Sequence, residues 1–243
     1  MPAAVVNEEE VEPTSLKGAQ GELRVLIDTR SGAEHVLLKV LRLSAGNAQR
    51  LSHPGSDDIL YVAEGRAEVS TFGGRVEVGN GSGVFAARKS GCRVGGNGLL
   101  VVWAMSPAPR EGYYTMEAYG IPPRTVSEDD QRPIPAGDDR SFKILVDPRL
   151  GAEHATQFVG FIRKSKAPPH THTYEEAIYI LEGDGIVHIG EDRHEPIRPR
   201  TSIFLPPGTP HCLENRGEQT LKLLGVFSPP GSPANKAEEP AQR

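Results

Sequence analysis

The chain has 243 residues, a formal net charge of −5 and 24% charged residues; this charge argues against binding nucleic acid through its phosphates. Its apolar stretches, such as residues 98–105, are too short to span a bilayer, and two cysteines are too few for a disulfide framework. With 27 glycines and 21 prolines, the composition favours many turns and short strands over a helical bundle.

The first twenty residues are acidic and small, and they lack the basic and long apolar regions of a secretory signal. We therefore predict a cytoplasmic protein in which residues 1–20 form a mobile tail or a wrapping arm. Residues 230–243, which are rich in proline and small side chains, are predicted to form a C-terminal tail of the same kind.

An internal repeat organises the rest of the chain. Residues 23–35 match residues 142–154 at an offset of 119, with 7 of 13 positions identical, and residues 59–65 parallel residues 177–183. Two copies of this length indicate a duplicated domain rather than a solenoid. We predict one domain over residues 21–118, a polar linker over 119–140 and a second domain over 141–229.

Within each copy the hydrophobic pattern has a period of two. Residues 66–72 and 185–190 alternate apolar with polar side chains, whereas residues 177–181 are continuously apolar. Glycine, aspartate and proline clusters interrupt the chain about every 8–12 residues, the spacing of short strands. The pattern predicts an all-β sandwich or barrel in each copy.

The second copy contains four side chains suited to binding a metal: His170, His172, Glu176 and His211. On a strand, residues two apart leave the same face, so we expect the first two histidines to point together. Antiparallel strands could bring the glutamate and the last histidine to the same point. Imidazole and carboxylate suit iron, manganese, nickel, zinc or cobalt, and four protein ligands on an octahedral ion leave open positions for substrate.

These residues lie in two spaced motifs that resemble the two motifs of the cupin family. The first motif reads His-x-His-x3-Glu-x6-Gly and the second Pro-x-Gly-x2-His-x3-Asn; their residues here are His170, His172, Glu176 and Gly183, and Pro206, Gly208, His211 and Asn215. Lys164 and Arg200 stand where the motifs often open with glycine. The resemblance covers most of residues 142–228. It implies two tandem jelly-roll (double-stranded β-helix) cupin domains, and that the three histidines and the glutamate bind one metal.

The first copy has the pattern of this family without its ligands. Alignment on Gly65 and Phe85 leaves only Asp58 and Cys92 as donors at the four ligand positions. A rearranged site of His53, Asp58 and Cys92 is one alternative. We predict instead a degenerate, metal-free domain, so that the chain is a bicupin with one working site. The Gly-Ala-Glu-His sequence at residues 32–35 and 151–154 occurs in both copies, so we predict a structural role for it.

The resemblance implies an enzyme acting on a small organic molecule. We favour a dioxygenase-type oxidoreductase that uses iron or manganese, with nickel, zinc or cobalt as alternatives. An isomerase, lyase or hydrolase, a non-catalytic metal-dependent binding or sensor protein, and a metal-free structural module stay open. A homodimer is compatible with the resemblance, and no nucleic acid or membrane partner is expected. The predicted substrate pocket comprises Tyr174, Ile178, Ile180, Phe204 and Arg163.

Overall fold

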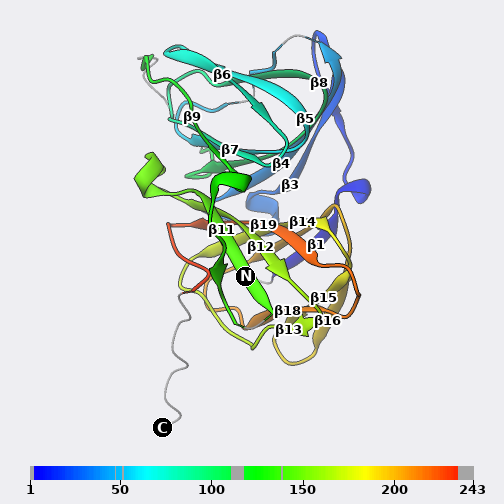
Figure 1. The fold of residues 1–243 in the computed structure, drawn as a ribbon. Coiled ribbons are helices and arrows are strands. Elements are labelled where there is room, and N and C mark those ends of the chain that lie inside the picture. Colours follow the sequence, from blue (N-terminus) through cyan, green and yellow to red (C-terminus); the bar gives the residue numbers. More distant parts are fainter. Residues whose placement is uncertain (1–2, 47, 51, 111–117, 138, 235–243) are drawn as a thin grey trace.

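The computed structural model describes residues 3–46, 48–50, 52–110, 118–137 and 139–234. Two β-barrels, one from each sequence copy, pack against each other (Figure 1). This confirms the predicted all-β class with tandem jelly-roll domains. The helical elements of the described residues are four single turns: η1 (Glu8–Glu10), η2 (Thr29–Ser31), η3 (Glu128–Asp130) and η4 (Pro148–Leu150). None of them is long and apolar enough to cross a membrane.

The N-terminal barrel is a single curved sheet with the strand order β2-β3-β4-β8-β5-β7-β9, and β6 pairs with β5. The long strands β5 and β8 pair with each other along most of their length, and register shifts near Val62 and Glu64 interrupt that pairing. The strands are β2 (Thr14–Ser15), β3 (Ala19–Ile27), β4 (Leu37–Gly46), β5 (Asp57–Thr71), β6 (Gly74–Gly79), β7 (Ser82–Ala86), β8 (Arg93–Ser106) and β9 (Arg124–Ser127).

The C-terminal barrel consists of two sheets. The larger sheet has the order β1-β17-β14-β19-β12-β11-β10, and the smaller has the order β13-β18-β15-β16. Their strands are β1 (Ala4–Asn7), β10 (Ile134–Pro135), β11 (Arg140–Val146), β12 (Thr156–Ile162), β13 (Ser165–Lys166), β14 (Glu175–Glu182), β15 (Gly185–Ile189), β16 (Arg193–Ile197), β17 (Thr201–Leu205), β18 (His211–Asn215) and β19 (Leu221–Ser228).

Each barrel takes one edge strand from the segment that precedes the other barrel. Strand β1, at the start of the chain, pairs with β17 of the C-terminal barrel. Strand β9, which precedes the C-terminal barrel, pairs with β7 of the N-terminal barrel. The predicted linker 119–140 therefore contains paired strands, and residues 1–20 include a wrapping arm rather than only a mobile tail. Of the predicted C-terminal tail, residues 235–243 lie outside the described part.

Three apolar clusters fill the molecule. One lies inside each barrel, and the third lies between the barrels and draws on both copies. The alternation along β14 shows how one strand serves two clusters: Ile178 and Ile180 belong to the interior of the C-terminal barrel, whereas Ala177 and Tyr179 belong to the cluster between the barrels. The continuously apolar sequence of this strand follows from its burial on both faces.

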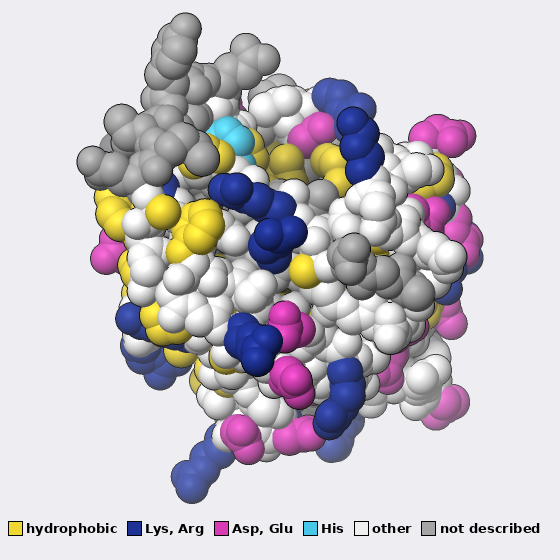
Figure 2. Space-filling view, turned by 90° about the horizontal axis from the view of Figure 1, so that it is seen from above, with side chains coloured by type: hydrophobic (Ala, Val, Ile, Leu, Met, Phe, Trp, Pro, Cys, Tyr) yellow, Lys and Arg dark blue, Asp and Glu magenta, His cyan; other side chains and the backbone are white. Residues whose placement is uncertain are grey.

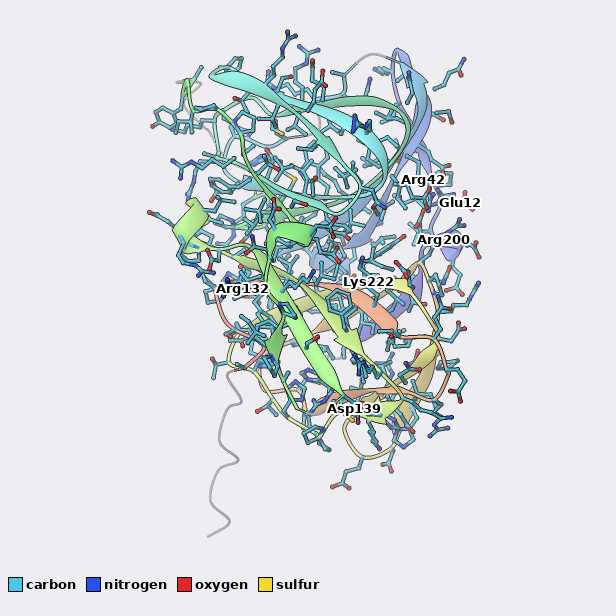
Figure 3. All side chains as sticks on the ribbon, viewed as in Figure 1. Glu12, Arg42, Arg132, Asp139, Arg200 and Lys222 are labelled. Carbon is cyan, nitrogen blue, oxygen red and sulfur yellow. The ribbon has the colours of Figure 1, made fainter. Side chains whose placement is uncertain are left out.

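A buried glutamate, Glu8, links the N-terminal segment that carries β1 to both barrels. Glu8 in η1 accepts hydrogen bonds from Arg42 of β4 at 2.7 and 3.1 Å and from the Tyr179 hydroxyl of β14 at 2.5 Å. Figure 3 places Arg42 at the level where the barrels meet. One carboxylate thus connects the N-terminal arm to both barrels.

A second buried glutamate, Glu128 in η3, plays the same part for the segment that carries β9. It accepts a hydrogen bond from the Tyr61 hydroxyl of β5 at 2.7 Å and forms an ion pair with Lys222 of β19 at 3.1 Å. Lys222 likewise lies between the barrels in Figure 3. Because Tyr61 and Tyr179 occupy equivalent positions of the repeat, the two carboxylates form a pair of related links.

The Gly-Ala-Glu-His repeats are the turns that end η2 and η4. Asp28 and Asp147 cap the two helical turns by accepting hydrogen bonds from the backbone N–H two residues later. Gly32 and Gly151 follow with φ of 90° and 104°, the left-handed region that side chains with a Cβ rarely adopt. The repeated aspartate and glycine are therefore structural, and both turns lie at the junction of the barrels: Glu175 and Ser228 of the C-terminal barrel bind the first turn, and Ser106 of the N-terminal barrel binds the second.

On the face seen from above, basic and acidic side chains are interspersed, with small apolar groups between them (Figure 2). No continuous basic surface forms on the described residues of this face, in keeping with the net charge of −5.

Candidate metal centre

Backbone pairing brings the histidines of the two motifs together. His170 and His211 form an isolated β-bridge, with N–H to carbonyl distances of 3.0 and 2.9 Å. His172 lies in the loop that precedes β14, not on a strand as expected. The Gly208 N–H donates to the His172 carbonyl at 2.7 Å and so joins that loop to the proline-rich turn before His211.

The three histidines and Glu176 converge inside the C-terminal barrel. One ring nitrogen from each of His170, His172 and His211 lies within 4.8 Å of the others. The Glu176 Oε2 atom lies 3.2 Å from His211 Nε2 and 3.6 Å from His172 Nε2. The three histidines therefore form one group, and Glu176 adjoins it through His172 and His211, although the loop conformation of His172 differs from the expected strand.

Backbone carbonyls orient two of the imidazoles. The His170 Nδ1 atom lies 3.0 Å from the Pro168 carbonyl, and His211 Nδ1 lies 2.8 Å from the Thr209 carbonyl. A carbonyl only accepts, so both Nδ1 atoms carry the proton and both Nε2 atoms can present a lone pair to an ion. The Tyr174 ring stacks on His172 with ring centroids 4.8 Å apart and an angle of 12° between the planes.

Two of the four groups, Glu176 and His170, favour the protonation states that a metal requires, whereas His211 does not. Burial lowers the pKa of His211, but the hydrogen bond and charge of Glu176 outweigh it and raise that pKa above its ordinary value, so a metal would have to displace a proton there. Burial, the largest influence, raises the pKa of Glu176, but the surrounding imidazoles outweigh it, so the pKa lies below its ordinary value. Burial, followed by the positive charge of His211, lowers the pKa of His170 to about 4. At neutral pH a carboxylate and a neutral imidazole are thus available as ligands.

The donor set fits a divalent transition metal. Three imidazoles and one carboxylate form a mixed nitrogen and oxygen set. Glu176 Oε2 is buried, and within the described part of the chain it accepts no hydrogen bond in the tautomer inferred for His211, although His211 Nε2 lies 3.2 Å away. A buried oxygen that accepts no hydrogen bond lowers the stability of the folded state unless an ion or a water molecule binds to it. His170, His172, Glu176 and His211 are the residues that would hold the metal.

A cavity of about 100 Å³ opens on this site. Its wall is mostly apolar and includes four phenylalanines that the sequence did not single out: Phe142, Phe158, Phe161 and Phe227. Arg140 and Ser141, at the start of β11, are polar residues among those that line the cavity. Arg140 falls at the end of the predicted linker but is the first residue of β11, and its place two residues before Phe142, where the sequence repeat begins, is the signal that could have identified it.

Only one of the five predicted pocket residues, Ile178, lines this cavity. Ile180 points to the same barrel interior but lies farther along β14, and Tyr174 stacks on His172 without lining the cavity. Phe204 packs between the barrels because its strand neighbours Ile203 and Leu205 take the inward positions. Arg163 is exposed and lines a neighbouring surface hollow.

The corresponding region of the N-terminal barrel holds a buried lysine. Lys39 Nζ lies 3.2 Å from Met105 Sδ and 4.2 Å from the centre of the Trp103 ring, and Trp103 donates to Asp58 at 2.9 Å. Burial lowers the pKa of Lys39 and raises that of Asp58, although each opposes the shift of the other. Within the described residues, His53, Asp58 and Cys92 do not gather into a group of metal ligands. An ammonium beside Asp58 disfavours a second cation at that position, and the metal-free first copy stays a prediction.

Arg200 shows why the second motif often opens with glycine. Its φ is 75°, in the left-handed region, and the equivalent residue of the first copy is Gly81 with φ of 79°. The second copy therefore keeps the left-handed backbone conformation at this turn with Arg200 in place of glycine.

Comparison with known proteins identifies the second barrel and the fold. Residues 159–227 match the model of the cupin domain, whereas a search of curated protein sequences finds no match. A structure of a mutant of oxalate decarboxylase from Bacillus subtilis superimposes with a TM-score of 0.77 at 13% identity, over 96% of this chain and 78% of that chain. Another structure of that enzyme, in work on its Mn(II) centres, gives 0.76 at 13%, over 92% and 76%.

A putative glyoxylate-induced protein from Pseudomonas aeruginosa has a TM-score of 0.75 at 16% identity, over 99% of this chain and 92% of that chain. At such identities the likeness shows the fold alone. Residues 159–227 therefore match a cupin domain, and the chain as a whole has the fold of two jelly-roll barrels that these structures share.

Proposed function

We propose that the C-terminal barrel is the active site of a metal-dependent enzyme that acts on a small organic acid. The convergence of three histidines and Glu176 beside a largely apolar cavity supports this proposal most strongly. The four side chains would hold iron or manganese, and a bound metal would act as a Lewis acid and as a site for dioxygen or substrate.

The residues around the site have distinct tasks in this proposal. Arg140 binds the substrate carboxylate in this proposal, because it is the cationic residue among those that line the cavity. The phenylalanines hold the apolar part of the substrate and exclude water. Pro168 and Thr209 keep His170 and His211 in the tautomer that leaves Nε2 free.

A dioxygenase-type oxidation is the first candidate reaction, because four protein ligands leave open positions for both substrate and dioxygen on an octahedral ion. Cleavage of the acid without net oxidation is the second, favoured by the similarity to oxalate decarboxylase. A screen of small hydroxy and oxo acids against the iron- and manganese-loaded protein tests both. Oxygen uptake matched by product supports the first, and CO₂ release without oxygen uptake supports the second. Tight binding without turnover supports a sensor instead.

Metal analysis tests the single-site prediction. We expect the anaerobically purified protein to contain about one transition-metal ion per chain, because one barrel retains a full ligand set. Replacing Cys92 by serine should leave this content unchanged, since Cys92 is fully buried beside Lys39 and Asp58. Two ions per chain, or a loss in the Cys92→Ser variant, would show that the first copy binds metal.

Arg140→Ala tests the substrate anchor. We expect the KM for an acid substrate to rise about 10- to 100-fold, the loss of one charge-assisted hydrogen-bonded pair, while metal content stays unchanged. Arg163→Ala is the matched control, because Arg163 borders the neighbouring hollow together with Arg140 but does not line the cavity. An equal rise in both variants, or none in Arg140→Ala, would contradict the assignment.

A further inference from the structure

The carboxylate next to the metal ligand Glu176 is bound by the other barrel. Glu175 Oε1 accepts a hydrogen bond from the Glu34 N–H at 2.7 Å, and its Oε2 accepts from the His35 and Val36 N–H groups at 2.9 and 3.1 Å. Glu175 is 3% exposed. Three consecutive N–H groups at the first Gly-Ala-Glu-His turn therefore enclose one buried carboxylate of the C-terminal barrel.

Glu175 and Glu176 share a backbone that is fixed from both sides. They are the first two residues of β14, and successive side chains of a strand point to opposite faces. Glu176 therefore faces the histidines while Glu175 faces the N-terminal barrel. Any movement of residue 175 away from the turn shifts the Cα atom from which the Glu176 side chain reaches the site.

The first copy lacks the reciprocal contact. Asp57 precedes Asp58 as Glu175 precedes Glu176, and it is equally buried at 3% exposure. Its Oδ1 atom accepts from the Arg88 N–H at 2.8 Å and so stays within its own barrel. The second Gly-Ala-Glu-His turn contacts the N-terminal barrel in a different way: the His154 carbonyl accepts a hydrogen bond from Ser106 Oγ at 3.1 Å. Among the described residues, the second copy thus uses its carboxylate, Glu175, to bind the other barrel, whereas the first copy uses Asp57 within its own barrel.

We propose that Glu175 is a positioning residue for the metal centre, held in place by the backbone of residues 34–36 in the ligand-free barrel. The N-terminal barrel thus contributes to metal binding without supplying a ligand. This inference rests on the proposed function, because it assumes that Glu176 and the histidines bind a metal.

Titration of the full-length apo-protein with Mn²⁺ tests the proposal, with free Mn²⁺ followed by electron paramagnetic resonance. We expect Glu175→Ala to weaken Mn²⁺ binding about 10- to 100-fold, the usual effect of removing a support of a ligand, and to change the spectrum of bound Mn²⁺. Glu175→Gln, which keeps one accepting oxygen, should fall between this variant and the original protein. Asp57→Ala removes the equivalent carboxylate of the first copy and should leave affinity and spectrum unchanged.

Two results would overturn the proposal: unchanged Mn²⁺ affinity and spectrum in Glu175→Ala, or an equal loss of affinity in Asp57→Ala, which would show a general destabilisation. If Glu175→Ala does not fold, Glu175→Gln decides, since unchanged affinity and spectrum in that variant overturn the proposal. Failure of the unsubstituted protein to bind Mn²⁺, Fe²⁺ or another divalent metal would instead reject the proposed function, a result that is read before any variant is compared.

Discussion

His172→Ala is expected to weaken metal binding by at least about 100-fold and to abolish turnover. Its effect should exceed that of removing a supporting group, which costs about 10- to 100-fold, because the substitution removes a ligand. His172 is 5% exposed, and its Nε2 lies 3.6 Å from Glu176. Elemental analysis of the purified variant, together with assay after metal loading, measures both effects.

His188→Ala is the control for that experiment. His188 is another buried histidine of the same barrel, but it hydrogen-bonds His194 and Glu214 at 2.9 and 2.8 Å and does not line the cavity. We expect full metal content in this variant. Full metal content in His172→Ala would remove that residue from the ligand set.

Glu8→Gln is expected to destabilise the folded protein by about 3 kcal/mol at neutral pH, because it leaves Arg42 without its counter-charge. This is the lower end of the range for breaking a buried ion pair, since the Glu8 side chain is 2% exposed but that of Arg42 is 24% exposed. Denaturant unfolding measures the free-energy difference. Glu9→Gln is the matched control: Glu9 is the neighbouring residue, half exposed, and pairs with Arg198 and Arg200 at the surface. Its loss should cost less than about 1 kcal/mol.

The same comparison has a defined pH dependence. Burial is the largest influence on the Glu8 pKa and raises it, but the hydrogen bonds from Arg42 and Tyr179 and the nearby positive charges outweigh it, so the pKa lies below its ordinary value of 4.5. Stability from an ionised carboxylate of this kind is fully present above pH 4.5 and is lost as the pH falls through the lowered pKa. The advantage over Glu8→Gln should therefore be constant from about pH 6 to about pH 8 and shrink in acid (about pH 4 and below). A constant advantage down to about pH 3 would contradict this account.

The fold class could be predicted from the sequence because it depends on a local hydrophobic period, and the grouping of the motif residues could be predicted because their spacing resembles that of the two cupin motifs. The hydrophobic period of two determines which side chains point into a barrel, and the internal repeat indicates that the chain forms two such barrels. The loop position of His172 was missed because the consecutive prolines Pro168 and Pro169 restrict the backbone and supply no N–H groups for a strand, whereas the spacing of the histidines carries no sign of this.

The remainder depends on contacts between distant segments. Pairing of β1 with β17 joins Ala4 to Phe204, and a four-residue segment carries little signal of its own for such a partner. Phe204 was misplaced for a related reason: β17 is buried on both faces, so its apolar run does not reveal which side chains face the cavity. Arg140 was missed because its segment resembles a linker in composition.

The exchange of edge strands also limits what this chain can lose. Truncation before residue 120 would leave β17 with an open edge, uncover the apolar side of Ala177 and Tyr179, and remove the amides that enclose Glu175. Removal of the first half is therefore expected to destabilise the C-terminal barrel, although that half supplies no side chain to the group of three histidines.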